Sequence, residues 1–83
     1  MAVPRRTQPR RDEAMPQVAS IGRELAQRRV QLGLTQQTLA DLSGVSRSSI
    51  QAIERGSGAI KLSSMVEIAG TLGLRVVLTA GNG

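Results

Sequence analysis

The sequence predicts an all-α domain of four core helices followed by one short C-terminal β-strand. Apolar residues recur at spacings of three and four in successive segments, which is the period of helices with one buried face. A glycine, a common helix terminator, follows each of these segments, at Gly33, Gly44, Gly56 and Gly73. Residues 74–79 are strand formers instead. We therefore expect a flexible basic arm at 1–18, a helical domain at 19–73, and a strand and tail at 74–83.

The amino-acid composition limits the classes of function that are possible for this chain. Eighty-three residues suffice for one small domain. The chain has no cysteine and no histidine, which excludes disulfides and Cys/His metal sites, so no metal or cofactor is expected. A formal charge of +5 favours a polyanionic partner, although charge alone does not separate DNA from RNA or from an acidic protein.

Nothing in the sequence indicates a membrane protein. No apolar run approaches the roughly 20 residues that a spanning helix needs. The N-terminal segment is arginine-rich but lacks the hydrophobic stretch of a secretory signal. We expect a cytoplasmic, nucleoid-associated protein without a membrane partner.

The predicted arm contains three prolines and two arginine pairs, with few apolar residues to bury. Such a segment does not fold on its own. Two roles stay open for it: an arm along DNA phosphates or in a minor groove, and a tail that only improves solubility.

The first helix is predicted over residues 20–32, with Ile21, Leu25 and Leu32 on its buried face. The fourth is predicted over residues 62–72, where a core-facing stripe consists of Met65, Ile68, Ala69 and Leu72. Lys61 stands at the capping position of the fourth helix. Lysine cannot cap, so the helix either starts later, at Ser63, or relies on water.

The central stretch, residues 35–56, reads TQQTLADLSGVSRSSIQAIERG. Thr35 and Ser46 are capping residues for helices at 36–43 and 47–55. Gly44 allows the sharp reversal between these helices. Ile50 and Ile53 give the second of them one apolar stripe. This pattern is the sequence form of a helix-turn-helix.

The motif TQ-x-x-LA-x-x-x-GVS-x-x-x-I-x-x-x-E-x-G resembles the lambdoid-repressor and Cro-type (XRE-like) helix-turn-helix family over residues 20–74. The resemblance implies a DNA-binding domain at 19–73. It also implies structural roles for Gly44 and for an ion pair between Arg29 and Glu54. Leu42 departs from the family, which usually has a polar residue there, and is either a half-exposed filler or a contact for a partner protein.

The same register implies which side chains contact double-stranded DNA, since a recognition helix places its N-terminal end in the major groove. Arg47 suits guanine, Gln51 suits adenine, and Ala52 suits the thymine methyl group. The full set of expected base contacts is Ser46, Arg47, Ser48, Gln51 and Ala52. The expected phosphate contacts are Gln36, Ser49, Arg55 and Lys61.

The predicted strand has no other strand in this chain with which to pair. Antiparallel pairing with the same strand of a second copy would make a two-fold homodimer through Leu74, Val76, Val77 and Leu78. The ending LGLRVVLTA resembles HipB-like antitoxins, whose terminal strands pair across a dimer, and this implies a kinase-like toxin as a partner. The alternative is a strand folded back on its own helices.

We therefore expect a dimeric, sequence-specific regulator, a repressor acting on a palindromic operator. The alternative is a protein-interaction module that has the helix-turn-helix shape but binds little DNA. An enzyme is not expected, because the acidic residues of the predicted helical domain, Glu24, Asp41, Glu54 and Glu67, are scattered singly, with no histidine or cysteine as a general base or nucleophile.

Overall fold

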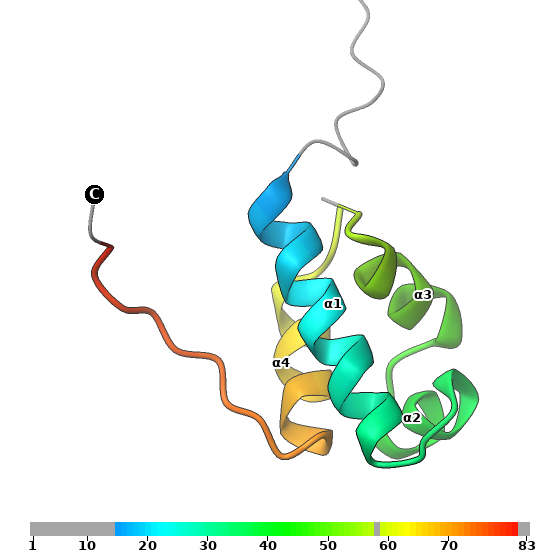
Figure 1. Cartoon of the computed structure of the whole chain (residues 1–83). Helices are drawn as coiled ribbons and strands as arrows, with labels where there is room; N and C mark the ends of the chain where they lie inside the picture. The colour runs from blue at the N-terminus through cyan, green and yellow to red at the C-terminus, as the bar shows by residue number, and fades with distance from the viewer. Residues whose placement is uncertain (1–14, 58, 82–83) are drawn as a thin grey trace, which may run out of the picture.

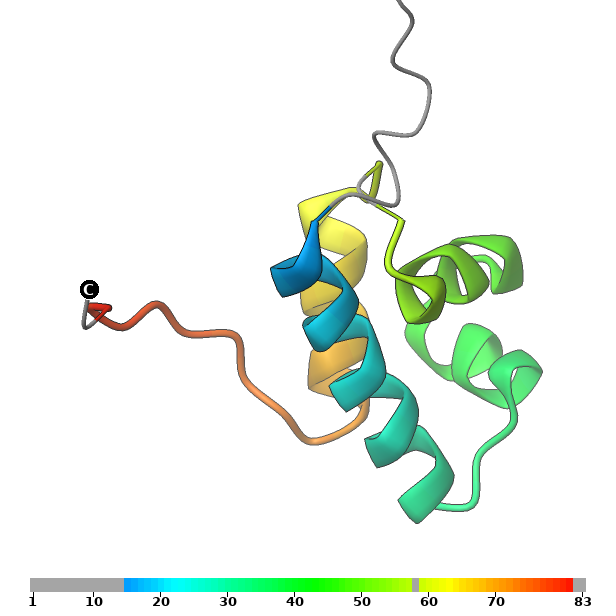
Figure 2. The same ribbon diagram turned by 45° about the horizontal axis from the view of Figure 1, so that its top comes forward.

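The computed structural model describes residues 15–57 and 59–81. Its four helices are α1 (Pro16–Gln31), α2 (Gln36–Ser43), α3 (Arg47–Arg55) and α4 (Leu62–Thr71). In Figure 1 and Figure 2, α2 and α3 lie on one side of α1 and α4, and the C-terminal segment leaves on the other side. The predicted four-helix arrangement and the bounds of α2 and α3 are confirmed.

The predicted helix start at residue 20 is wrong, because α1 begins at Pro16 and includes the last residues of the predicted arm. Proline suits the first position of a helix, because its missing N–H has no intrahelical partner there and its φ angle already fits. Met15 precedes it without a side-chain cap. Both arginine pairs of the predicted arm lie at 5–11, outside the described residues.

Aliphatic side chains from all four helices and the α2–α3 turn form the core. Its buried members are Leu25, Leu39, Ala40, Val45, Ile50, Ile53, Ile68, Ala69 and Leu72. Burial of each large member is worth about 1.5–3 kcal/mol relative to exposure. The predicted stripe of α4 is confirmed, with Met65 packed half-buried at the edge of the core.

The predicted buried face of α1 is only partly right. Leu25 is buried, but Ile21 is 42% exposed and Leu32 is 44% exposed. Gly22 is buried instead, and a Cβ atom at this position would collide with the backbone carbonyl oxygen of Ile53. Helix α1 therefore packs on α3 through a close backbone approach, which a hydrophobicity pattern cannot reveal.

Side-chain hydrogen bonds cap the N-terminal ends of α2 and α3. The Thr35 hydroxyl accepts from the Thr38 N–H at 3.0 Å, and the Ser46 hydroxyl accepts from the Ser49 N–H at 3.2 Å. Between the helices, Gly44 has a φ angle of +78°, which L-residues with a Cβ rarely adopt. The caps and the glycine thus set where α3 starts and in which direction it runs.

Both ends of α4 lack a capping side chain of their own. Lys61 precedes the helix without a side-chain hydrogen bond, and the helix nevertheless starts at Leu62 rather than at Ser63. At the other end, the Nε atom of Arg28 donates to the Leu72 carbonyl oxygen at 2.9 Å. Arg28 therefore ties α1 to the C-terminal end of α4, a role that the sequence did not indicate.

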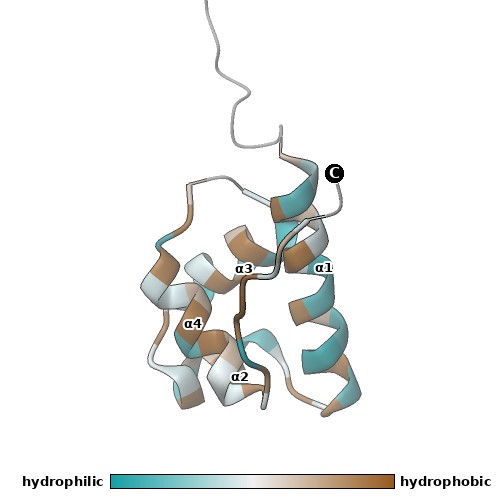
Figure 3. Cartoon of the chain, turned by 90° about the vertical axis from the view of Figure 1, so that its left-hand side faces the viewer, coloured by the Kyte–Doolittle hydropathy of each residue, from teal (hydrophilic) through white to brown (hydrophobic). Residues whose placement is uncertain are grey.

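The C-terminal segment from Leu74 onward is extended, and the described part of the chain contains no β-strand. A strand is defined by backbone pairing, and the residues that the structure describes offer this segment no second edge. Its apolar residues are exposed: Leu74 by 36%, Val76 by 43%, Val77 by 62% and Leu78 by 97%. Figure 3 shows the hydrophobic colouring along the middle of the segment. Pairing across a dimer stays a prediction.

Candidate nucleic-acid interface

Helix α3 is buried on one side and exposed on the other. Ile50 and Ile53 lie in the core, whereas Arg47, Ser48 and Gln51 are exposed to solvent. The helix lies at the edge of the domain, away from the C-terminal segment (Figure 2). It therefore presents a polar face with one arginine and one glutamine near its N-terminal end, the arrangement with which a helix can enter a DNA groove.

Three serines cluster at the start of this face. The Ser46 hydroxyl donates to the Ser49 hydroxyl at 3.0 Å and lies 3.3 Å from that of Ser48. Ser46 also accepts the Ser49 N–H, so its capping role uses most of its hydrogen-bonding capacity. The side chains here are short, so the backbone of α3 can approach a partner closely.

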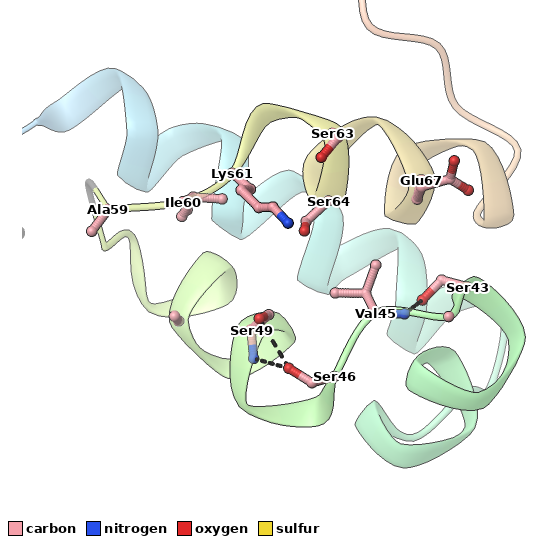
Figure 4. A pocket seen from close by; sticks show the side chains of 12 residues that line it. Ser43, Val45, Ser46, Ser49, Ala59, Ile60, Lys61, Ser63, Ser64 and Glu67 are labelled. Carbon is pink, nitrogen blue, oxygen red and sulfur yellow. Dashed lines mark hydrogen bonds between the residues drawn. The ribbon is translucent and has the colours of Figure 1, made fainter.

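An open groove of about 710 Å³ lies between α3 and the start of α4. Among the predicted phosphate contacts, Ser49 and Lys61 line this groove, and Ala52, a predicted base contact, lines it as well. In Figure 4, Lys61 points into the groove beside Ser64. The groove thus combines hydroxyl groups, the Lys61 ammonium group, the Glu67 carboxylate and the first turn of α4, whose N–H groups favour an anion.

An ion pair joins the end of α1 to the end of α3. The Arg29 Nε atom lies 2.7 Å from Glu54 Oε2, and Arg29 Nη2 donates to Glu54 Oε1 at 3.1 Å. Arg29 Nη1 also donates to the Leu34 carbonyl oxygen at 2.8 Å. The two side chains are only 15% and 11% exposed. The hydrogen bond from Arg29 to Glu54 raises the pKa of Arg29 further above its ordinary value.

Gln36 extends this network to the exposed face of α3. Its Nε2 atom donates to Glu54 Oε1 at 2.9 Å, and its Oε1 atom accepts from Gln51 Nε2 at 3.5 Å. The sequence indicated Gln36 only as a phosphate contact. Its bonds to Glu54 and Gln51 were missed because they join residues of different helices, which no spacing along the chain reveals.

The structure gathers part of the predicted site. Arg47, Ser48 and Gln51 share the outer face of α3, and Gln36 lies beside that face. Arg55 is exposed as the last residue of α3. Among the described residues, no three potential metal ligands of the His, Cys, Asp or Glu type gather in one place. None of the described helices has the length and apolarity to span a bilayer.

The fold and this surface define a class of protein, the helix-turn-helix regulators that bind DNA. A helix-turn-helix family model matches residues 25–78, and the chain belongs to that family. It is similar to the restriction-modification controller protein C.AhdI from Aeromonas hydrophila, whose crystal structure is known. The two share 33% sequence identity and a TM-score of 0.67, over 74% of this chain and 92% of the controller. No curated protein sequence matches the chain.

Proposed function

We propose that the chain is a sequence-specific regulator of transcription that acts as a homodimer and represses by occupying a palindromic operator. The observation that carries this proposal is the exposed face of α3, where Arg47, Ser48 and Gln51 lie together on a helix held by an ion pair. The similarity to a restriction-modification controller supports a regulatory role.

In the proposed complex, α3 lies in the major groove and α2 crosses the backbone. Arg47 donates two hydrogen bonds to a guanine, and Gln51 pairs with an adenine edge. Ser46, Ser48 and Ala52 complete the base-facing set. Contacts to phosphates come from Gln36, Ser49, Arg55 and Lys61. Phosphate contacts fix the register and base contacts specify the sequence, so substitutions in the two sets have different effects.

Dimerisation is assigned to the C-terminal segment. Leu74 and Val76 of this segment line one side of a groove of about 250 Å³. Ile21 of α1 and Met65 of α4 line the same groove. Its exposed backbone groups and apolar side chains together favour antiparallel pairing with the same segment of a second copy. A two-fold dimer binds inverted half-sites about one helical turn apart, ~34 Å.

Selection of bound duplexes from a random DNA pool tests this function. The expected product is an inverted repeat with two equal half-sites. Enrichment of a single asymmetric half-site would contradict the dimer, and no enrichment over the starting pool would contradict sequence-specific binding.

A second candidate is the binding of a partner protein. Leu42 is 63% exposed on α2, and Leu78 is almost fully exposed in the C-terminal segment. These residues suit an apolar contact with another protein, such as the kinase-like toxin that the HipB-like ending implies. A toxin gene beside this gene would indicate an antitoxin, whereas restriction-modification genes beside it would indicate a controller of that system. Binding that never exceeds non-specific affinity for DNA would favour this candidate.

A further inference from the structure

Gln36 stands between the ion pair of Arg29 and Glu54 and the exposed face of α3. Glu54 Oε1 accepts two hydrogen bonds, one from Arg29 Nη2 at 3.1 Å and one from Gln36 Nε2 at 2.9 Å. Gln36 is half-buried and Gln51 is exposed. The contacts therefore run from a largely buried charge to a side chain in the solvent.

The chemistry of these groups fixes the direction of every hydrogen bond. An ionised carboxylate only accepts, so Gln36 must turn its NH₂ group towards Glu54. The Gln36 oxygen is then left facing Gln51, which must donate its own NH₂ group to it. Reversing either amide would place two oxygens, or two NH₂ groups, against each other.

We propose that Arg29, Glu54 and Gln36 form a relay that fixes the orientation of the Gln51 amide, and that Gln36 is thereby a positioning residue for base recognition. The relay uses one N–H of the exposed Gln51 and leaves its oxygen and its other N–H available to a base. That pair of groups complements adenine, which offers an N6 donor and an N7 acceptor in the major groove. Guanine offers two acceptors there and fits the fixed amide less well. This inference rests on the proposed function.

Gln36→Met tests the relay, because methionine keeps the length of the side chain but cannot form these hydrogen bonds. The Arg29–Glu54 pair remains in this variant. Gln37→Met is the matched control: Gln37 is the next residue of α2, and its Nε2 donates to Asp41 Oδ1 at 3.0 Å, away from the relay. Gln51→Met identifies the base pair that Gln51 contacts.

Binding is measured on the selected duplex and on duplexes that replace each base pair in turn. For Gln36→Met we expect the adenine preference at the Gln51 base pair to fall about tenfold, with little change at other positions. The double variant Gln36→Met/Gln51→Met should show no further loss there. Gln37→Met should keep the full preference.

A second readout does not need DNA. In the free protein, the NMR signals of the Gln51 side-chain NH₂ group should shift in Gln36→Met and stay in place in Gln37→Met. Unmoved signals would overturn the relay.

The outcomes separate the relay from the function on which it rests. Weakening of Gln36→Met by the same factor on every duplex, with the adenine preference at the Gln51 base pair unchanged, would leave Gln36 as a phosphate contact alone and would overturn the relay, with sequence-specific binding intact. A Gln51→Met variant that keeps every base preference would likewise overturn it. Wild-type protein that prefers no sequence would overturn the proposed function itself.

Discussion

At the scale of single residues, the contact between Arg29 and Glu54 links the core to the proposed DNA-binding surface. The family resemblance implied this pair but left its burial undecided between an exposed and a buried contact. The structure has both side chains largely buried, with the guanidinium bonded to the carboxylate and to the Leu34 carbonyl oxygen. Since the pKa of Arg29 is raised, its stabilising contribution is fully present at every pH below the ordinary value for arginine.

We expect Arg29→Met to lower the free energy of unfolding by about 3 kcal/mol, because it leaves the Glu54 carboxylate buried without its partner. Urea denaturation followed by circular dichroism measures this loss. Arg23→Met is the matched control, an exposed arginine on the same helix, and should change stability by no more than about 0.5 kcal/mol. Equal stability of the two variants would show that the pair contributes little.

For base recognition, Arg47→Ala should cost about 1–3 kcal/mol of binding free energy on the preferred duplex and relax discrimination at one base pair. The reason is the loss of a side chain that donates two hydrogen bonds to one base. Fluorescence anisotropy on single-base-pair variants of the duplex measures both effects. Equal losses on preferred and random DNA would contradict a base contact.

Lys61→Ala provides the contrasting case, because the predicted role of Lys61 is a phosphate contact. Binding should weaken by a similar factor on every duplex. The slope of log K against log salt should become shallower by about 1, since one fewer counterion is released. A change in sequence preference instead would place Lys61 near the bases.

At the scale of helices, the features carried by short-range patterns were predictable. Capping residues, glycine stops and apolar spacing gave the bounds of α2 and α3. The early start of α1 and its Gly22 contact were not predictable. Proline at a first helical position looks like a helix breaker in the sequence, and Gly22 matters only because the α3 backbone lies against it.

Gly22→Ala tests that close approach. The added methyl group would meet the Ile53 carbonyl, so we expect a loss of about 1–3 kcal/mol in unfolding free energy. Gly70→Ala is the matched control, because Gly70 is also helical and has no atoms within 4 Å of a Cβ position. It should be neutral or stabilising by up to about 1 kcal/mol. Equal effects of the two substitutions, measured by thermal unfolding, would contradict the proposed packing of α1 on α3.

At the scale of the whole molecule, the helical domain and the C-terminal segment lie in different surroundings. The helices bury a shared core, whereas residues 74–81 are exposed throughout. The residue pattern predicts a strand in this segment, but strand pairing depends on a second edge, and the described part of the chain supplies none. The same limit applies to the DNA contacts, because side-chain positions on α3 define a surface but not the operator that it recognises.

Val76→Asp should convert the proposed dimer into a monomer, because a carboxylate would be buried between the paired apolar segments. Sedimentation equilibrium distinguishes the 8.8 kDa chain from a species of twice that mass. Thr79→Asp, on the opposite side of the predicted strand, should leave the dimer largely intact. The helical circular dichroism of both variants should match the wild type, since neither residue lies in the core. A wild-type protein that is already monomeric would contradict pairing through this segment.

The most direct test of the central claim compares the affinity of the full chain for two duplexes at 150 mM salt. One is the most abundant duplex recovered from the random pool, and the other is a scrambled duplex of the same composition. If the exposed face of α3 reads base sequence, the recovered duplex should bind at least about 10³-fold more tightly. Equal affinities for the two duplexes would contradict the account.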